Sequence, residues 1–347
     1  MGGAGRALMD GFNFSSVNPA LLAGFRRASL SALYRVQRRS LDEGTGRRYT
    51  VADGDLGAFQ LAFPARGGFV LGVGLEPLTD MDFGVEDSVG TGLESHVLQL
   101  EATGGIQALS IGVAKRVSRE LSLGVRLDWI SMGTLTENWI KTYEDPRLTK
   151  SEDQIVRSHR GWLPSLGAVF TPSEHWAFGL AFQVETSVEQ RQVLRNLNLG
   201  SEGEVRNEVD VTLPYVVGVG VAYLGGYYWA ATVDFERGFW SRTEPGRHNT
   251  LDLSGGLLYR MGSPDPLSKS LRIEWNGGVH YRSLYFPTAS GSQISELGVS
   301  LGVAIPFKNE GGRFRYLLEV GKRGDVQKHG VSERFIQQSI SVSGFIN

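Results

Sequence analysis

A strict alternation of apolar residues with polar or small ones dominates this chain from about residue 28 to the C-terminus. In the segment 121–129, every second position is apolar: Leu121, Leu123, Val125, Leu127 and Trp129. Ser, Gly, Arg and Asp lie between them. Successive side chains of a β-strand point to opposite faces of its sheet, so such a segment has one wholly apolar face. The pattern predicts a chain made almost entirely of β-strands.

The same alternation returns in 176–184, 227–236, 271–282, 297–305 and 314–320. Several of these strands exceed the usual length of soluble strands and reach the 9–11 residues that a tilted strand needs to cross a bilayer. Aromatic residues lie near strand ends on the apolar face, as at Trp129, Trp176 and Tyr281. Membrane barrels carry aromatic girdles at these positions. These features favour a transmembrane β-barrel over a soluble β-sandwich.

The connections between the expected strands alternate in length, which also indicates an outer-membrane barrel. Short joins and longer loops, the latter near 39–54, 78–104, 133–159, 187–208, 240–248, 284–294 and 324–333, separate about fourteen antiparallel strands. Both termini then lie at the end with short turns, in the periplasm, and the strand count is even. Counts of twelve and sixteen stay open. The expected strands lie near 28–38, 55–64, 68–77, 105–117, 120–132, 160–171, 174–186, 209–224, 226–239, 249–261, 270–283, 295–307, 312–323 and 334–345.

A closed barrel has a physical reason in a membrane, because hydrocarbon offers no water to an unpaired backbone group and closure removes every sheet edge. The 46 glycines fit this architecture, since small inward residues leave room in the lumen and relieve the strain of curvature. The sequence contains no run of 18 apolar residues, so it predicts no membrane-spanning helix. The start of the sequence lacks the basic and apolar parts of a signal peptide, so we expect a mature or trimmed form.

The composition excludes several classes of functional site. The chain has no cysteine, which excludes disulfides and cysteine-based metal or nucleophile sites. Its net charge of −2, with acids and bases interleaved, provides no basic patch for nucleic acid. None of the six histidines lies in a metal-binding or nucleophile motif. We therefore expect no enzyme activity, no cofactor and no metal, and outer-membrane lipid as the surroundings.

The first 27 residues do not alternate, and here the chain resembles the FadL-type family of outer-membrane transporters for hydrophobic compounds. The resemblance is carried by the Gly-rich start Met1-Gly-Gly-Ala-Gly5 and by Asn18-Pro19-Ala20 shortly before the first strand. It implies a fourteen-strand barrel in which residues 1–26 form a hatch that plugs the periplasmic end of the lumen, and residues 27–347 form the barrel. The expected hatch residues are Gly2, Gly3, Gly5, Asn18 and Pro19.

Asn18-Pro19 is a turn-starting pair, and Pro19 can open a short helix. Phe12, Phe14, Leu21 and Leu22 would then face the barrel or a ligand. The alternatives are a loose tail, or a plug with no part in transport.

The third strand of family members carries a kink that opens the barrel wall sideways. Gly72, Gly74 and Pro77 could allow this, because proline removes a ladder donor and glycine weakens a strand. The simpler alternative, which we favour, is that Pro77 ends its strand. The chain departs from a common outer-membrane pattern at its end, where Phe345 is followed by Ile346 and Asn347.

Charged residues at inward positions have two interpretations: they guide a ligand with a charged head group, or they pair across strands and stiffen the lumen, which we favour. His280 is expected to make a hydrogen bond in the lumen. The inward charges are Arg126, Asp128, Asp234, Glu236, Arg272, Glu274, Arg282, Arg315 and Glu319.

Two functions remain. The leading hypothesis is a passive channel for hydrophobic small molecules, such as fatty acids. The alternative is a structural or docking barrel, a subunit or shuttle of an outer-membrane protein assembly or secretion system, with a protein partner at the extracellular loops or the periplasmic side.

Overall fold

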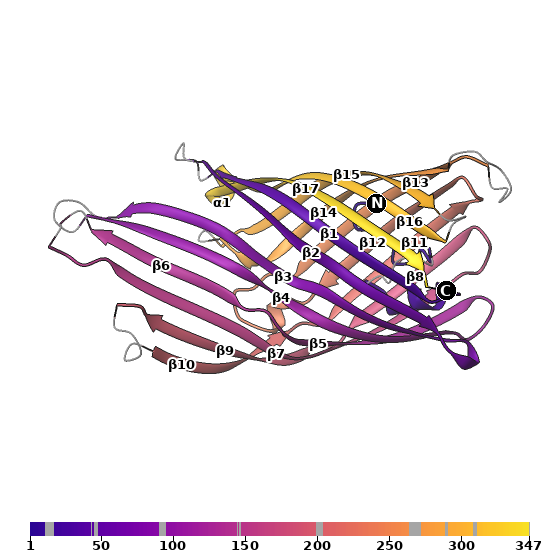
Figure 1. Ribbon diagram of the computed structural model, residues 1–347, viewed down its shortest axis with the longest axis horizontal. Helices are drawn as coiled ribbons and strands as arrows, with labels where there is room; N and C mark the ends of the chain where they lie inside the picture. Colours follow the sequence, from indigo (N-terminus) through magenta and orange to yellow (C-terminus); the bar gives the residue numbers. More distant parts are fainter. Residues whose placement is uncertain are drawn as a thin grey trace.

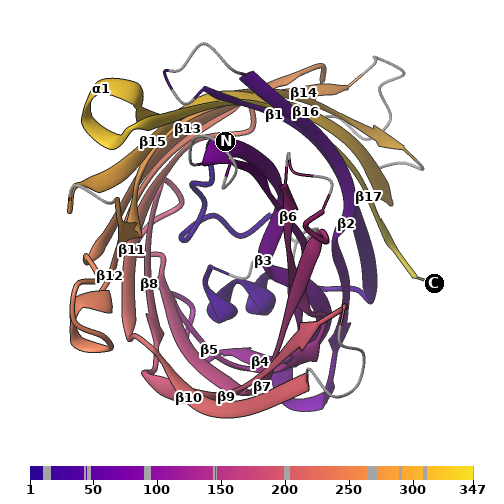
Figure 2. The ribbon, with the colours of Figure 1, turned by 90° about the vertical axis from the view of Figure 1, so that its left-hand side faces the viewer.

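Fourteen antiparallel strands close into a barrel (Figures 1 and 2), as the alternation predicts. The computed structural model describes residues 1–10, 17–42, 44, 48–89, 95–143, 145, 147–198, 204–263, 272–288, 291–307 and 311–346. Closure is made by the first and last strands, β1 (Ser29–Asp42) and β17 (Val331–Phe345), which pair from Ser29 opposite Phe345 to Asp42 opposite Ser332. The start of β1 and the end of β17 therefore lie side by side at one end of the barrel.

Three of the fourteen strands are divided into two parts: β5 continues as β6, β8 as β9, and β10 as β11. The helical elements are η1 (Pro19–Gly24), η2 (Arg66–Gly68), η5 (Trp240–Arg242) and α1 (Val326–His329). The remaining strands are β2 (Arg48–Pro64), β3 (Phe69–Val89), β4 (His96–Arg116), β5 (Leu121–Met132), β6 (Leu135–Tyr143), β7 (Ser151–Phe170), β8 (Trp176–Gln183), β9 (Thr186–Asn196), β10 (Glu204–Leu213), β11 (Val216–Gly225), β12 (Trp229–Gly238), β13 (Thr250–Met261), β14 (Ile273–Pro287), β15 (Gln293–Phe307) and β16 (Gly312–Asp325).

The outer face of the barrel is apolar. In β5, Leu123, Val125 and Leu127 are exposed, whereas the residues between them are buried. β8 shows the same alternation, with Trp176, Phe178 and Leu180 exposed. Large apolar side chains are exposed in this way around the barrel, far beyond the patches that soluble monomers tolerate. Within the described part of the chain, no helix has the length and hydropathy to cross a membrane.

The long loops predicted at 78–104, 133–159 and 187–208 are wrong over most of their length, because they are strand, whereas 240–248 contains no strand. β3 continues to Val89 and β4 begins at His96 inside the expected loop 78–104, and β6, β9 and the start of β7 fill most of two others. In the same way β1 and β2, and β16 and β17, reach into the expected loops 39–54 and 324–333. The two ends of the barrel therefore differ less in loop length than in how far the strands run on.

These extensions form a sheet that projects past one side of the barrel, seen at the left of Figure 1. We call it the wing: β3 from Thr79, β4 up to Gly105, β6, β7 up to Arg160, β9 and β10. The strands that enter the wing are interrupted where they leave the barrel. The register shifts between Pro77 and Thr79 in β3, and three other strands break at 133–134, 184–185 and 214–215.

Each interruption exchanges the two faces of its strand. Even-numbered residues such as Ile130 point inward in β5, but odd-numbered Leu135 joins the same inner cluster in β6. Likewise the inward residue Ala177 of β8 is followed by the inward Val188 of β9, the first odd and the second even. One extra residue in a strand has this effect, because side chains alternate with a period of two.

Candidate functional site

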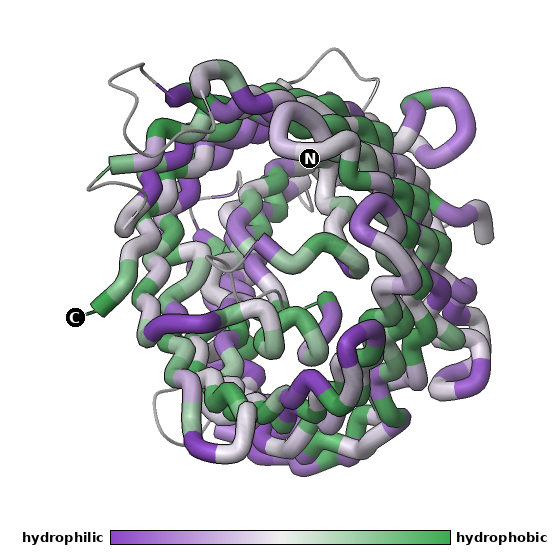
Figure 3. The backbone as a smooth tube through the Cα atoms, turned by 90° about the vertical axis from the view of Figure 1, so that its right-hand side faces the viewer, coloured by the Kyte–Doolittle hydropathy of each residue, from purple (hydrophilic) through white to green (hydrophobic). Residues whose placement is uncertain are grey.

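The N-terminal segment, residues 1–26, lies inside the ring of strands, as Figures 2 and 3 show for its described parts. The η1 helix contacts β3, β4, β5 and β7. Farther round the wall, the backbone N–H of Gly2 donates to the Ser300 hydroxyl at 3.0 Å. The segment contacts β5, β7 and β8 near those ends of the strands that adjoin the short turns. The segment thus occupies the half of the lumen nearest the chain termini.

Local sequence explains the short helix. The Asn18 side-chain oxygen accepts from the Ala20 N–H at 3.1 Å and caps η1, while Pro19 occupies its first turn without needing a donor. The Asn18 amide nitrogen donates to the carbonyl oxygens of Arg6, at 2.8 Å, and Ala168, at 3.1 Å. This one buried side chain therefore joins the helix, the start of the segment and the barrel wall.

The predicted contact residues Leu21 and Leu22 are buried against the wall. Leu22 packs with Phe25, Ala62, Val70 and Ala114. Leu21 packs with Ala20 and Val169, and it also borders a small cavity described below. Phe12 and Phe14, for which the same role was expected, lie outside the described residues.

Inward glycines give the segment its space. A Cβ atom on Gly124 would lie 2.5 Å from the carbonyl carbon and oxygen of Pro19, a separation that real Cβ atoms do not show. A Cβ atom on Gly167 would overlap the side chains of Asn18 and Pro19, and one on Gly179 would overlap the backbone of Arg6. Gly256 and Gly278 do the same for the first two residues. These glycines are where the segment approaches the backbone of the wall most closely.

Replacing Gly124 by alanine should displace η1 from the wall, because the methyl group would overlap the backbone of Pro19 and Ala20. We expect faster hydrogen exchange at the N–H groups of Leu21 and Phe25, which now donate to Asn18 and Leu22 within the helix. Gly255→Ala is the matched control, since the nearest atom to its Cβ is 3.8 Å away. Equal exchange rates in the two variants would contradict the close fit.

Asp234 binds the segment through its carboxylate. Its Oδ2 accepts from the backbone N–H groups of Gly5 and Arg6, both at 2.8 Å. The Arg6 guanidinium lies 3.9 Å from the same oxygen and also pairs with Glu236. Asp234 and Arg6 are both buried, so the charges are removed from water together. At the other side of the lumen, Asp10 lies 3.7 Å from both Arg313 and Arg315.

Most of the predicted lumen charges form ion pairs. Arg126 pairs with Asp128 at 2.9 Å and with Glu76 at 3.7 Å. Glu274 pairs with Arg260 at 2.9 Å and with Arg313 at 3.3 Å.

Farther along the lumen, Arg282 lies 2.5 Å from Asp252 and 3.6 Å from Glu296. His280 has the expected hydrogen bond, to Glu296 at 3.0 Å. Arg272 also interacts with a neighbouring group, and it borders a cavity. Glu319 is half-buried, and its side chain makes no hydrogen bond or ion pair within the described part of the chain.

The expected end of β3 at Pro77 is wrong, because the strand continues to Val89. Gly72 and Gly74 lie in its regularly paired part, opposite Ala62 and Gln60 of β2. Among residues 48–89, all of them described, β2 and β3 pair only between Phe59–Pro64 and Val70–Leu75. Beyond Leu75 the ladder stops, and Pro77 is the second residue after it.

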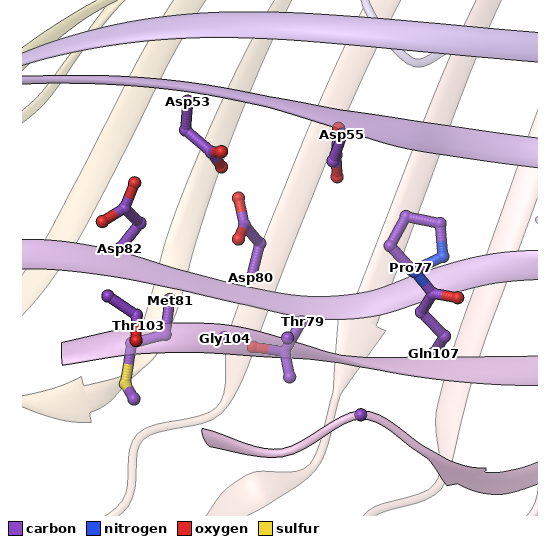
Figure 4. Close-up of a pocket in the computed structure, with 12 residues that line it drawn as sticks. Asp53, Asp55, Pro77, Thr79, Asp80, Met81, Asp82, Thr103, Gly104 and Gln107 are labelled. Atoms are coloured by element: carbon purple, nitrogen blue, oxygen red, sulfur yellow. The ribbon is translucent and has the colours of Figure 1, made fainter. Parts of the chain in front are cut away.

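A cavity of about 320 Å³ lies at this interruption (Figure 4). Asp53 and Asp55 of β2 point toward Asp80 and Asp82 of β3 across the gap between the strands. Arg35 of β1 bridges part of it, 2.7 Å from Asp55 and 4.0 Å from Asp80. Where the paired part of the two strands ends, the Gln60 amide of β2 donates to the Glu76 carboxylate of β3 at 2.7 Å. No cluster suited to a metal ion occurs among the described residues.

A second cavity, of about 190 Å³, separates the N-terminal segment from β13, β14 and β16. Its apolar lining includes Leu8, Leu21, Leu258 and Leu317, and Arg315 also borders it. Apolar side chains of the segment and of the wall thus surround a common space here, and Asp10, Arg260 and Asn276 also border it.

The family model described as BamG matches residues 1–344. The chain belongs to the BamG family. No curated protein matches it.

Solved structures of FadL type share the fold of this BamG-family chain. The toluene transporter TbuX of Ralstonia pickettii is 15% identical, with a TM-score of 0.67 over 100% of this chain and 97% of that one. The CymD monoaromatic hydrocarbon channel is 16% identical, with a TM-score of 0.64 over 99% and 95%. A FadL homologue of Pseudomonas aeruginosa is 11% identical, with a TM-score of 0.64 over 95% and 93%. The chain thus shares the barrel fold of these FadL-type structures.

Arg6, Asp10 and Glu76 were missed from the sequence. Arg6 and Asp10 lie in a segment without alternation, so no pattern places their side chains against the wall. Glu76 has the inward parity of Gly72 and Gly74, and this parity was the signal that could have found it.

Proposed function

We propose that this barrel is a passive conduit through which small hydrophobic molecules cross the outer membrane, and that the interrupted ladder between β2 and β3 is their lateral exit. The interruption carries the proposal, because it leaves a cavity between two consecutive strands, β2 and β3, whose ladder stops at Leu75. The FadL-type neighbours whose printed descriptions name toluene and monoaromatic hydrocarbons are consistent with such a ligand. The N-terminal segment, residues 1–26, is the plug in this proposal, with its end of the barrel in the periplasm.

The charge of the gap favours neutral ligands over fatty acids. Four aspartates line it, and they outnumber the two arginines whose charges act on Asp80, Arg35 and Arg39. A carboxylate that passed between Asp53 and Asp82 would meet like charges at short range, which costs free energy even near a surface. The small cavity beside Leu8 and Leu258 also suits a compact molecule better than a long acyl chain.

Cross-linking across the gap tests the conduit. The chain has no native cysteine, so Asp53→Cys with Asp82→Cys can be joined by a bismaleimide without side reactions at other thiols. Uptake of radiolabelled toluene into cells should then fall about ten-fold. Leu301→Cys with Leu318→Cys is the matched control, because these residues are already opposite each other in a continuous ladder. Equal toluene uptake by wild-type and deletion strains would refute the function.

A structural or docking barrel is the second candidate, and one observation favours it. Asp234, Asn18 and the inward glycines fix the N-terminal segment to the wall through buried backbone contacts, as a permanent seal requires. Such a barrel would co-purify with a protein partner in a fixed ratio, and the cross-link across the gap would leave both the partner ratio and cell growth unchanged. A ten-fold fall in toluene uptake on cross-linking would count against this candidate.

A further inference from the structure

The wing ends at β10, a strand with a free edge. All ten residues of β10 pair with β9 in one continuous register. On its other side, β12 accompanies only β11 and ends at Gly238, opposite Val216. Among the described residues, no strand continues beside β10 above that point. Figure 1 shows β10 at the lower margin of the wing.

Side-chain exposure agrees with an uncovered edge. The six residues from Val205 to Asp210 are all exposed, and Val205 is 60% exposed. The connection between β12 and β13, residues 239–249, meets the chain just beyond the C-terminal end of β10, where Phe239 stacks on Tyr215 with ring centroids 4.3 Å apart. A bare edge presents a row of backbone donors and acceptors that another strand can use.

The other margin of the wing is different. The edge of β3 faces β2 across the gap, and the Tyr49 hydroxyl donates to the Glu86 carbonyl oxygen at 2.8 Å. Side chains of both strands line the space between them. β3 is therefore screened by the chain itself. Proline and bulges commonly protect edges, but β10 contains neither between Glu204 and Leu213.

Each face of β10 has its own chemistry. Val211 packs with the inner cluster, so Val205 and Val209 also belong to the inner face, and both are exposed. The outer face presents Glu204, Arg206, Glu208 and Asp210. An added strand would therefore place alternate residues against apolar and charged positions.

Asp210 lacks a compensating charge. Its partner in the β9–β10 ladder is Glu189, a like charge, which is unfavourable for directly opposite residues. No hydrogen bond or ion pair involves the Asp210 side chain within the described residues. Glu208, in contrast, lies 3.4 Å from Arg191. Arg160, Glu189 and Asp210 lie side by side on β7, β9 and β10. A basic residue on the free side of Asp210 would therefore supply it with an opposite charge.

We propose that β10 is a docking edge for an extended segment of a partner protein, in which apolar residues alternate with basic ones. The segment adds to the wing as a further strand, with its backbone bonded to β10, its apolar residues beside Val205 and Val209, and a basic residue beside Asp210. This binding is independent of ligand passage, and only its placement outside the cell rests on the proposed orientation.

The test uses the full chain in detergent and a fluorescent ten-residue peptide that alternates valine and lysine. Fluorescence anisotropy measures binding, and hydrogen exchange locates it. We expect slower exchange in β10 and not in β12, and at least five-fold weaker binding of a peptide that alternates valine and glutamate. Equal binding of the two peptides, or protection elsewhere in the chain, would overturn the proposal.

Asp210→Lys should weaken binding of the lysine peptide about five-fold. Glu174→Lys is the matched control, because it makes the same charge change at an exposed turn at the opposite end of the barrel. Heat-dependent migration on a gel checks that both variants form the barrel, and the two-peptide comparison on the unmodified chain does not depend on either. Protection of β10 that rises with chain concentration, without peptide, would show a second copy on this edge and contradict the proposal.

Discussion

Asp234→Ala is expected to release the N-terminal segment from the lumen wall. The substitution removes the acceptor of two backbone N–H groups and leaves Arg6 buried beside only Glu236. Removing one partner of a buried ion pair typically costs about 3–5 kcal/mol. The docked state of the segment should therefore lose at least a hundred-fold in its equilibrium, roughly 1.4 kcal/mol being ten-fold. Labelling of an Ala7→Cys thiol by a polar maleimide should become correspondingly faster.

Asp55→Ala is the control for this experiment. It also removes a carboxylate from a partly buried ion pair with an arginine, at 2.7 Å, but it lies on β2 and makes no contact with the segment among the described residues. Labelling at position 7 should be unchanged in it. If Asp234→Ala also left the labelling rate unchanged, the carboxylate would not be holding the segment.

The second large effect concerns the outer face. Val125→Arg should destabilise the barrel by roughly 2–4 kcal/mol, because a guanidinium near the bilayer midplane is removed from water. Val125 lies in the middle of the apolar face of β5 and is 51% exposed on the protein surface. Leu180→Arg on β8 should behave alike. Urea titration of refolding into lipid vesicles, followed by tryptophan fluorescence, measures the free energy.

Ala181→Arg provides the inward counterpart. Ala181 follows Leu180 directly but borders a lumen cavity of about 190 Å³ that Gln183 and Glu236 also line. An arginine there reaches polar neighbours and water, so its cost is set by space within the cavity. Equal destabilisation by Leu180→Arg and Ala181→Arg would mean that the two faces do not differ in their surroundings.

Sequence alone predicted the barrel and most of its transmembrane strands, because their alternation is regular. Each strand that crosses the bilayer must keep one apolar face, so its sequence is tightly constrained, as in 121–129. The wing was missed for the opposite reason. Its strands are not held by lipid, so their apolar alternation is weaker: in β10 the odd positions carry Val205, Val209 and Val211 but also a polar Asn207.

The interruptions hid the wing further. An extra residue at Leu78, and the breaks at 133–134 and 184–185, exchange odd and even positions, so a regular period ends where the strand itself continues. Pro77 was taken for a strand end, although it lies where β3 has lost its β2 partner and the absent N–H donor has little cost.

The candidate site was predictable only in part. The inward charges follow from parity, but their partners Arg6 and Asp10 lie in the one segment that has no period. Gly124 and Gly167 are needed because Pro19 packs against them in the folded barrel. That long-range contact leaves no pattern in the sequence around either glycine.

The central claim is that the N-terminal segment lies inside a closed barrel whose alternate residues face lumen and lipid. Thiol cross-linking tests it directly, since the chain has no cysteine of its own. Ala7 packs with the inward residue Ala177, whereas the next residue, Phe178, points outward. Ala7→Cys with Ala177→Cys should give a high yield with a short thiol cross-linker in intact membranes, and Ala7→Cys with Phe178→Cys should give none. Equal yields, or no product from the first pair, would contradict the structure described.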